Sequence, residues 1–255
     1  MTDLPQPDPA AGVFETLLVA RGAPVELGAH LERLGASAGE LYGATLPPAA
    51  RELAGERAAG VELGRLRLTL TPRPDAEPLL EAAVQSVDPA TVLPGWELAL
   101  DLRTVAAGGW RGAHKWADRR PLEALDARAA PEAALLLDGD GSVLETTRAN
   151  VFALGEDSVL RTPPSDGRIL PGIARARVVE LARAAGTDVR EERLTVRQLH
   201  AARELFATGS VRGIEPVRSL DGAAIGEPGT GRGPVTTALA DELRRAWLGE
   251  PVAAA

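Results

Sequence analysis

Strand-like and helix-like segments follow one another along this chain without a strict alternation. Stretches typical of strands occur at 12–20, 64–72 and 78–87, whereas the run "IARARVVELARAAG" at 173–186 repeats apolar side chains at helical spacing. A regular strand–helix–strand order would favour a parallel sheet, but these segments do not keep that rhythm. The sequence therefore predicts an α+β fold with mixed sheets.

A Pro- and Gly-containing stretch, "DPATVLPG" at 88–95, separates two parts that each hold strand and helix patterns. Boundaries between domains usually fall in such segments, and 255 residues are enough for two small domains. We therefore expect a small domain over 1–87, a linker over 88–95 and a larger domain over 96–255.

The charge balance argues against nucleic acid as a partner. The formal net charge is −8, whereas phosphate backbones attract a basic excess. There is no cysteine, and the three histidines are scattered, so we expect no metal site. No apolar run reaches the roughly 18 residues of a membrane span, and the first twelve residues are not typical of a signal peptide. We expect a cytoplasmic protein with no membrane partner.

Lys115, in "GAHKWADRR", is the single lysine among 28 basic residues. A coding bias towards arginine is one explanation for its isolation. The other is chemical, because a lysine amine loses its proton and acts as a nucleophile, which a guanidinium does not do. The residues around Lys115 alone do not decide between these explanations.

Two glycine-containing junctions offer backbone N–H groups to an anion. Pro171 and Gly172 precede the helix predicted from Ile173, and the first N–H groups of a helix, here those of Ile173 and Ala174, bind phosphate readily. Gly209 and Ser210 follow a predicted strand and add an N–H and a hydroxyl. Each junction is equally compatible with an ordinary turn.

A glutamate interrupts an apolar strand. Glu145, in "GSVLETTRANVF", lies late in that strand, and Asn150 begins the next one. Because a buried charge is costly, the carboxylate either faces solvent or has a partner.

Five stretches, taken in order, resemble the class IV aminotransferases, the fold-type-IV family of pyridoxal-phosphate enzymes. They are "GVFETLLVARGAPVELGAHLERL", "HKWADRRPLEAL", "LLLDGDGSVLETTRANVFAL", "TPPSDGRILPGIARARVVELA" and "LFATGSVRGIEPVRSLDG". The resemblance implies a D-amino-acid-aminotransferase-like fold, with a small α/β domain and a larger mixed α/β pseudo-barrel domain. It also implies pyridoxal 5'-phosphate as cofactor, a small amino substrate and a homodimer.

The resemblance assigns the reactive groups. Lys115 falls at the family's Schiff-base lysine, and Glu145 at the carboxylate that pairs with the pyridine nitrogen. Leu170 matches the apolar residue that packs on the ring. These roles agree with chemistry, because an imine needs an amine and a protonated ring nitrogen stores carbanion electrons.

The same resemblance assigns the phosphate contacts. Arg33, in "HLERL", matches the arginine that binds the phosphate, although an exposed helix position is the alternative. Ile173 and Ala174 match the helix-start amides, and Ser210 matches a hydroxyl contact. The family usually has Thr where Ala174 stands, so one hydroxyl contact is lost while the N–H remains.

The reaction within the family is left open between elimination and transamination. The short chain, the "K…DRR…LEAL" run and a single tyrosine favour 4-amino-4-deoxychorismate lyase, which releases pyruvate and 4-aminobenzoate for folate synthesis. A transaminase of the D-amino-acid or branched-chain type is the alternative, and a non-catalytic member of the family is a third.

The substrate contacts are less defined than the cofactor contacts. The first hairpin usual in the family is missing before residue 12, and the Gly-rich loop usual after residue 72 is also missing. A substrate carboxylate should meet an arginine. Arg67, Arg111 and Arg148 are the candidates, and for each of them an ordinary surface position is the alternative.

Overall fold

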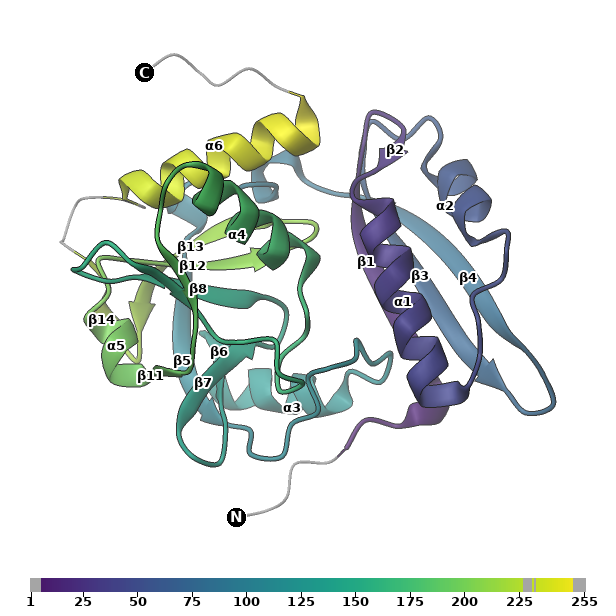
Figure 1. The fold of residues 1–255 in the computed structure, drawn as a ribbon, viewed down its shortest axis with the longest axis horizontal. Coiled ribbons are helices and arrows are strands. Elements are labelled where there is room, and N and C mark those ends of the chain that lie inside the picture. Colours follow the sequence, from purple (N-terminus) through teal and green to yellow (C-terminus); the bar gives the residue numbers. More distant parts are fainter. Residues whose placement is uncertain (1–5, 227–230, 232, 250–255) are drawn as a thin grey trace. The chain divides into compact units, whose positions relative to one another are not determined.

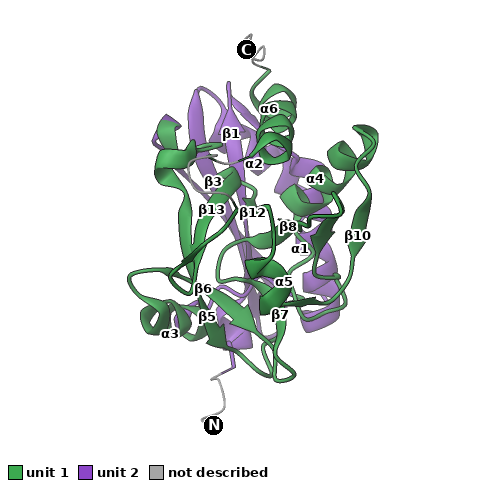
Figure 2. Ribbon diagram, turned by 90° about the vertical axis from the view of Figure 1, so that its left-hand side faces the viewer, with its two compact units in different colours: residues 1–5, 90–113, 121–255 green, residues 6–89, 114–120 purple. Residues whose placement is uncertain are grey.

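Two compact units make up the computed structural model, which describes residues 6–226, 231 and 233–249 (Figure 2). The N-terminal unit comprises residues 6–89 and 114–120, and the C-terminal unit comprises the described residues of 90–113 and 121–249. The chain therefore leaves the N-terminal unit after residue 89 and returns to it for the seven residues that contain Lys115.

The N-terminal unit is a four-stranded antiparallel sheet with two helices. The strand order is β2-β1-β3-β4. Helix α1 lies along β1 and β3 (Figure 1) and ends before Gly43, whose φ of 62° suits a glycine after a helix. The elements are a 3-10 turn (Pro9–Ala11), β1 (Val13–Ala20), β2 (Ala23–Pro24), α1 (Leu27–Tyr42), α2 (Ala50–Ala58), β3 (Leu63–Arg73) and β4 (Ala76–Ser86).

The C-terminal unit is built on a mixed sheet in the order β10-β9-β8-β12-β13-β5-β6-β7-β11, with β14 beside β13. Parallel pairs join β13 to β5, β5 to β6 and β9 to β10, and the other pairs are antiparallel. An antiparallel sheet in one unit and a mixed sheet in the other, each accompanied by helices, confirm the predicted α+β class. The strands are β5 (Leu100–Ala106), β6 (Ala133–Leu137), β7 (Ser142–Thr146), β8 (Asn150–Leu154), β9 (Leu160–Thr162), β10 (Val189–Glu191), β11 (Leu194–Thr195), β12 (Glu204–Gly209), β13 (Gly213–Leu220) and β14 (Ala223–Ala224).

Helices complete the C-terminal unit. Helices α4 and α6 pack against each other and against β12, and α6 also contacts β13 (Figure 1). No described helix has the length and hydropathy that crossing a membrane requires. The helices are α3 (Arg120–Ala129), α4 (Ile173–Ala184), α5 (Val196–His200) and α6 (Pro234–Leu248), with 3-10 turns at Pro89–Thr91 and Trp96–Leu98.

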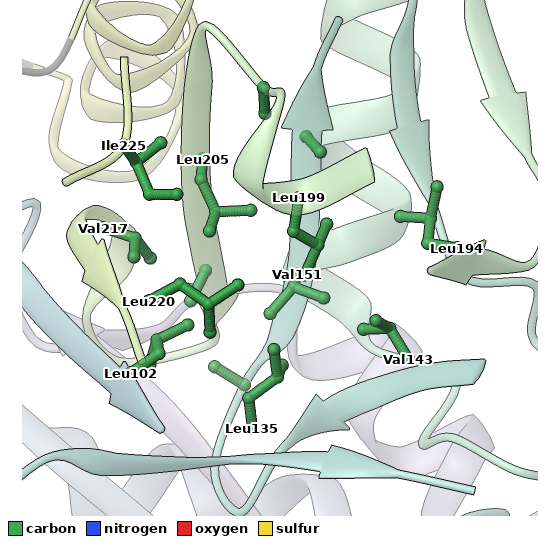
Figure 3. Close-up of a cluster of buried hydrophobic side chains, with 14 residues drawn as sticks. Leu102, Leu135, Val143, Val151, Leu194, Leu199, Leu205, Val217, Leu220 and Ile225 are labelled. Carbon is green, nitrogen blue, oxygen red and sulfur yellow. The ribbon is translucent and has the colours of Figure 1, made fainter. Parts of the chain in front are cut away.

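One cluster of buried apolar side chains packs against one face of the sheet in the C-terminal unit. Strands distant in the strand order contribute to it, with Leu102 from β5, Val143 from β7 and Val151 from β8 (Figure 3). The sheet therefore curves around the cluster, and removal of these side chains from water supplies its main stabilisation. The turns at the ends of the strands, which carry the predicted phosphate contacts, are thereby held on a rigid frame.

A glutamate from the sheet caps the last helix. Gly233 precedes α6 and has no side chain to accept the first N–H groups, which a helix leaves without acceptors of its own. The buried carboxylate of Glu204 accepts the N–H of Val235 at 3.1 Å and both the N–H and hydroxyl of Thr236 at 2.6 and 2.7 Å. This single side chain fixes the start of α6 on β12.

Replacement of Glu204 with alanine should therefore destabilise the protein. The E204A substitution leaves buried donors without an acceptor, which costs about 1–3 kcal/mol of unfolding free energy. Urea unfolding of the purified variant measures the loss. The matched control is E180A, which removes only an exposed pair with Arg177 and should change the unfolding free energy by less than about 0.5 kcal/mol. Equal stability of E204A and E180A would contradict the capping role.

Candidate functional site

Backbone pairing with β1 holds the Lys115 segment in the N-terminal unit. The N–H of Phe14 donates to the carbonyl of Lys115 at 2.9 Å, and the N–H of Ala117 donates to the carbonyl of Gly12 at 2.9 Å. Gly12 has a φ of 87°, and a Cβ there would lie 2.1 Å from the Leu70 carbonyl oxygen, so only glycine fits. The backbone at Lys115 is consequently fixed by contacts on both sides.

A phenylalanine ring brings two of the predicted site residues together. The Lys115 Nζ lies 5.1 Å from the centroid of the Phe14 ring, and the Arg67 guanidinium carbon lies 3.8 Å from the same centroid. Such cation–π contacts are favourable where water is partly excluded. Burial lowers the pKa of Arg67, and the neighbouring charge of Arg65 acts in the same direction. Arg67 is thus a half-buried cation beside the single lysine.

Arg33 is held by a buried glutamate that the sequence did not indicate. The Nε and Nη2 atoms of Arg33 donate to the two carboxylate oxygens of Glu15 at 2.8 and 2.6 Å, and His30 Nδ1 lies 2.7 Å from Glu15 Oε2. Burial alone would raise the pKa of Glu15, but the charge of Arg33 and the hydrogen bonds from His30 and Arg33 lower it to about 2. Burial lowers the pKa of His30, which keeps this histidine neutral at pH 7.

Asp118 fastens the Lys115 segment at its other end. Its buried carboxylate accepts the N–H of Asp8 at 2.9 Å and the Nε and Nη2 donors of Arg120 at 2.8 Å each. Hydrogen bonds from Arg120 and then from the Asp8 backbone hold the pKa of Asp118 well below its usual range. Asp118 therefore fixes the end of the segment that contains Lys115.

Glu145 is buried in the C-terminal unit, so the outward-facing alternative is wrong. The residue is 7% exposed, and its carboxylate accepts the N–H of Leu170 at 3.1 and 3.2 Å and the Nδ2 donor of Asn150 at 2.9 Å. Asn150 also donates to the carbonyl of Leu170 at 3.0 Å. Glu145, Asn150 and Leu170 thus form one small network, and the strand-start position of Asn150 was the sequence signal for the amide.

The predicted helix-start contacts lie beside this network. Gly172 precedes α4 without a side-chain cap, and a Cβ on it would lie 1.9 Å from Asn150 Oδ1, so the position requires glycine. The next two residues, Ile173 and Ala174, open α4 and are buried. Their N–H groups are among those that a helix leaves for an external acceptor.

Two residues with hydroxyl groups, Thr208 and Ser210, lie at the end of β12 and at the start of the turn to β13. β12 ends at Gly209, and Ser210 begins the turn to β13. Thr208 pairs with Asn150 in the antiparallel ladder, which places the two side chains on the same face of the sheet. The hydroxyl of Thr208, a residue 2% exposed, is buried and has no hydrogen-bond partner among the described residues. Thr208 could not be singled out from the sequence, because its position opposite Asn150 depends on the strand register.

Two of the predicted substrate residues, Arg111 and Arg148, lie on a loop and a turn of the C-terminal unit. Arg148 is on the turn between β7 and β8, where its side chain is 81% exposed and lies 3.6 Å from Asp126. Arg111 is exposed on the loop after β5. Among the described residues, no three His, Asp or Glu side chains are grouped to hold a metal ion.

Curated relatives match part of this chain. The branched-chain-amino-acid aminotransferase of Escherichia coli (strain K12) is 39% identical over 117 residues, which cover 46% of this chain and 37% of the relative. The match therefore spans little more than a third of the length of that relative.

Solved structures match the chain over nearly its whole length. A pyridoxal-phosphate-bound hypothetical aminotransferase from Mycobacterium tuberculosis superposes with a TM-score of 0.81 and 28% identity, covering 98% of this chain and 94% of the other. A proposed 4-amino-4-deoxychorismate lyase from Legionella pneumophila shares the fold, with a TM-score of 0.76, 23% identity and 96% of each chain covered. The model of the amino-transferase class IV family matches residues 12–220, and the chain therefore belongs to this family of pyridoxal-phosphate enzymes.

Proposed function

We propose that this chain binds pyridoxal phosphate through Lys115 and transforms an amino substrate that carries a carboxylate. The buried Glu145 network carries this proposal, because a carboxylate withdrawn from water needs a cationic or hydrogen-bonding partner. In a family whose members use this cofactor, a ring nitrogen is the partner for which such a carboxylate is suited.

The residues of the C-terminal unit fit the phosphate end of the cofactor. Gly172 leaves the start of α4 open, and the buried Thr208 hydroxyl has no partner among the described residues. Helix-start N–H groups and hydroxyls are donors that a phosphate accepts. We assign the backbone amides of Ile173, Ala174 and Gly209 and the hydroxyl of Ser210 to this role.

Two residues of the N-terminal unit complete the cofactor assignment. Arg33 is proposed as the phosphate-binding guanidinium, and Glu15 fixes its plane through a two-point hydrogen bond. Lys115 is proposed as the amine that holds the cofactor, and its backbone is fixed by β1. Leu170 is assigned to pack against the ring, and its N–H orients Glu145.

Each assigned side chain has a separate task in the reaction. Pyridoxal phosphate, when bound, supplies a carbonyl carbon for amines and a ring that accepts electrons. The carboxylate of Glu145 keeps a proton on the ring nitrogen. When the substrate amine takes the place of Lys115, the Lys115 Nζ becomes free to act as a base. It then takes the proton from the carbon that bears the substrate amine and returns that proton at a second position.

The substrate carboxylate is assigned first to Arg67. This guanidinium is half-buried beside Phe14, the ring that Lys115 also contacts. A partly desolvated arginine binds a carboxylate more strongly than one fully surrounded by water. Arg111 and Arg148 remain candidates for a second carboxylate.

Elimination of pyruvate from 4-amino-4-deoxychorismate is the first specific reaction that we propose. Its support is the scarcity of tyrosine, because the hydroxyl of the single tyrosine, Tyr42, donates to the carbonyl of Pro9 at 2.9 Å. Transamination is the second candidate, and the 39% identity with the Escherichia coli branched-chain aminotransferase favours it.

We further propose a homodimer in the cytoplasm that acts on small molecules. The dimer rests on the family resemblance, and the location rests on the sequence pattern alone. The net charge of −8 supports the absence of nucleic acid from the partners.

The single lysine makes its proposed role directly measurable. Borohydride reduction of the protein with pyridoxal phosphate should fix the cofactor mass on one tryptic peptide, residues 112–119, because no other lysine competes. Trypsin should also fail to cleave after the modified Lys115. The K115R variant keeps the positive charge but should lose the fixed mass, the yellow colour and turnover. Cofactor mass found only on other residues would overturn the assignment.

Replacing Glu145 with glutamine should separate binding from catalysis. The E145Q side chain still accepts from Leu170 but carries no charge, so the ring nitrogen loses its proton. We expect cofactor uptake to persist while turnover falls by about 10²-fold or more. Absorbance titration measures uptake, and steady-state assays measure turnover. The control is E180Q, on the exposed pair with Arg177, and turnover of E145Q within twofold of this control would refute the role of Glu145.

Product analysis should distinguish the two reactions. The loaded protein incubated with 4-amino-4-deoxychorismate is expected to release pyruvate and 4-aminobenzoate in equal amounts. If transamination is the reaction, leucine and a 2-oxo acid should instead exchange the amino group without pyruvate release. The K115R protein serves as the blank in both assays, and turnover in neither assay would contradict both specific proposals.

A further inference from the structure

Asn150 is the single asparagine of the chain, and only 3% of it is exposed at the start of β8. Both N–H donors and the oxygen of a buried amide need partners, a demand that an apolar side chain would not make. The proposed reaction gives Asn150 no role of its own, although its partner Glu145 is assigned to the ring nitrogen. The contacts of the amide therefore indicate what it contributes.

The turn between β7 and β8 sets Glu145 opposite Asn150. The N–H of Thr146 donates to the carbonyl of Ala149 at 2.8 Å, and the N–H of Ala149 donates to Thr146 Oγ1 at 2.9 Å. Glu145 immediately precedes this closed turn, and Asn150 immediately follows it. The two side chains therefore meet across the turn, where Asn150 Nδ2 donates to Glu145 Oε2 at 2.9 Å.

Two acceptors fix the orientation of the amide. Nδ2 of Asn150 donates to the carboxylate of Glu145 and, at 3.0 Å, to the carbonyl of Leu170. Neither partner atom can donate, so only the NH2 end of the amide can face them. The oxygen end, Oδ1, is consequently turned away from Glu145.

Asn150 and Thr208 lie on the face of the sheet that points away from the apolar cluster. Their neighbours Val151 and Ala207 belong to that cluster, and successive side chains of a strand point to opposite faces (Figure 3). On this face a Cβ on Gly172 would lie 1.9 Å from Asn150 Oδ1. The φ of −68° and ψ of 131° at Gly172 are open to any residue. Gly172 therefore makes room for the amide at the start of α4.

The carboxylate of Glu145 accepts hydrogen bonds from two sources. One is the N–H of Leu170, at 3.1 and 3.2 Å, and the other is the amide of Asn150. Each donated hydrogen bond favours the charged form of a carboxylate. A proton shared between a carboxyl group and a pyridine nitrogen lies on the more basic of the two, so these donors direct the proton to the nitrogen.

We propose that Asn150 is a positioning residue that orients Glu145 and keeps its carboxylate charged, so that the shared proton is held by the ring nitrogen of the cofactor. This inference rests on the proposed function, because it names the residue through which Glu145 performs its assigned role. The same amide binds the carbonyl of Leu170, which is assigned to pack on the ring. One side chain thus sets two contacts to the ring.

Nitrogen NMR of the loaded protein tests the inference without turnover. Pyridoxal phosphate labelled with nitrogen-15 in its ring reports whether that nitrogen carries a proton. We expect a protonated ring in wild type and a signal moved towards the unprotonated position in N150A, which lacks the donor. The movement should be larger in N150D, which places a second carboxylate beside Glu145. Turnover should fall in the same order, by about 10-fold or more in N150D.

The matched control changes an amide to a carboxylate elsewhere in the same unit. Gln198 is exposed in the cap of α5, where its Oε1 accepts the N–H of Thr195 at 2.8 Å. The Q198E variant adds the same charge as N150D and should leave the ring-nitrogen signal and turnover unchanged.

Gly172 allows the amide of Asn150 to be displaced without being altered. The methyl group of G172A occupies the space of Oδ1, so the ring-nitrogen signal should move in the same direction as in N150A. The N150A/G172A double variant should move it no further than N150A alone, because the amide through which the methyl group acts is gone. If N150A does not fold, N150L replaces it, since it keeps the volume without the donors.

The outcomes distinguish this inference from the proposed function. A wild-type ring-nitrogen signal in the folded, loaded N150A or N150L protein overturns the inference and leaves the assignment of Glu145 standing. A wild-type protein that takes up no pyridoxal phosphate, or that holds its ring nitrogen unprotonated, refutes the assignment of Glu145 and this inference together.

Discussion

The cost of removing a carboxylate from water shapes this structure at four positions. Three of them, Glu15, Glu145 and Glu204, meet donors from another element or loop, and the fourth, Glu215, pairs with Arg212 in its own hairpin. Glu15 ties β1 to α1, and Glu204 ties β12 to α6. Because a lost partner would leave a charge in a poorly solvated place, each carboxylate specifies which elements must pack together. Two of these carboxylates also serve the proposed chemistry, because Glu145 is assigned to the ring nitrogen and Glu15 holds Arg33, which is assigned to the phosphate.

Features that depend on local periodicity could be predicted from the sequence. The apolar repeat at 173–186 matches α4 at Ile173–Ala184, and the strand expected at 12–20 matches β1 at Val13–Ala20. The singling out of Lys115 did not need a structure either, because an amine and a guanidinium differ in chemistry wherever they lie. The order of motifs then gave the family, which the match over residues 12–220 confirms.

Features that depend on long-range packing could not be predicted in this way. The two-point contact of Arg33 with Glu15 and the buried position of Asp118 arise from residues that have no fixed spacing. Thr208 faces Asn150 only because β12 and β8 pair in one register, and a shift of one residue would turn it to the other face.

The return of residues 114–120 to the N-terminal unit has a consequence for folding during synthesis. A ribosome releases the chain from its N-terminus, so residues 6–89 emerge before the strand edge at Gly12–Phe14 can meet Lys115–Ala117. Residues 90–113 of the other unit must emerge first. Until then that edge offers unpaired backbone groups, which are a risk for wrong pairing with neighbouring chains. The N-terminal unit is consequently completed only after the first segment of the C-terminal unit has emerged, and the segment with the reactive amine is the last part of the N-terminal unit to join it.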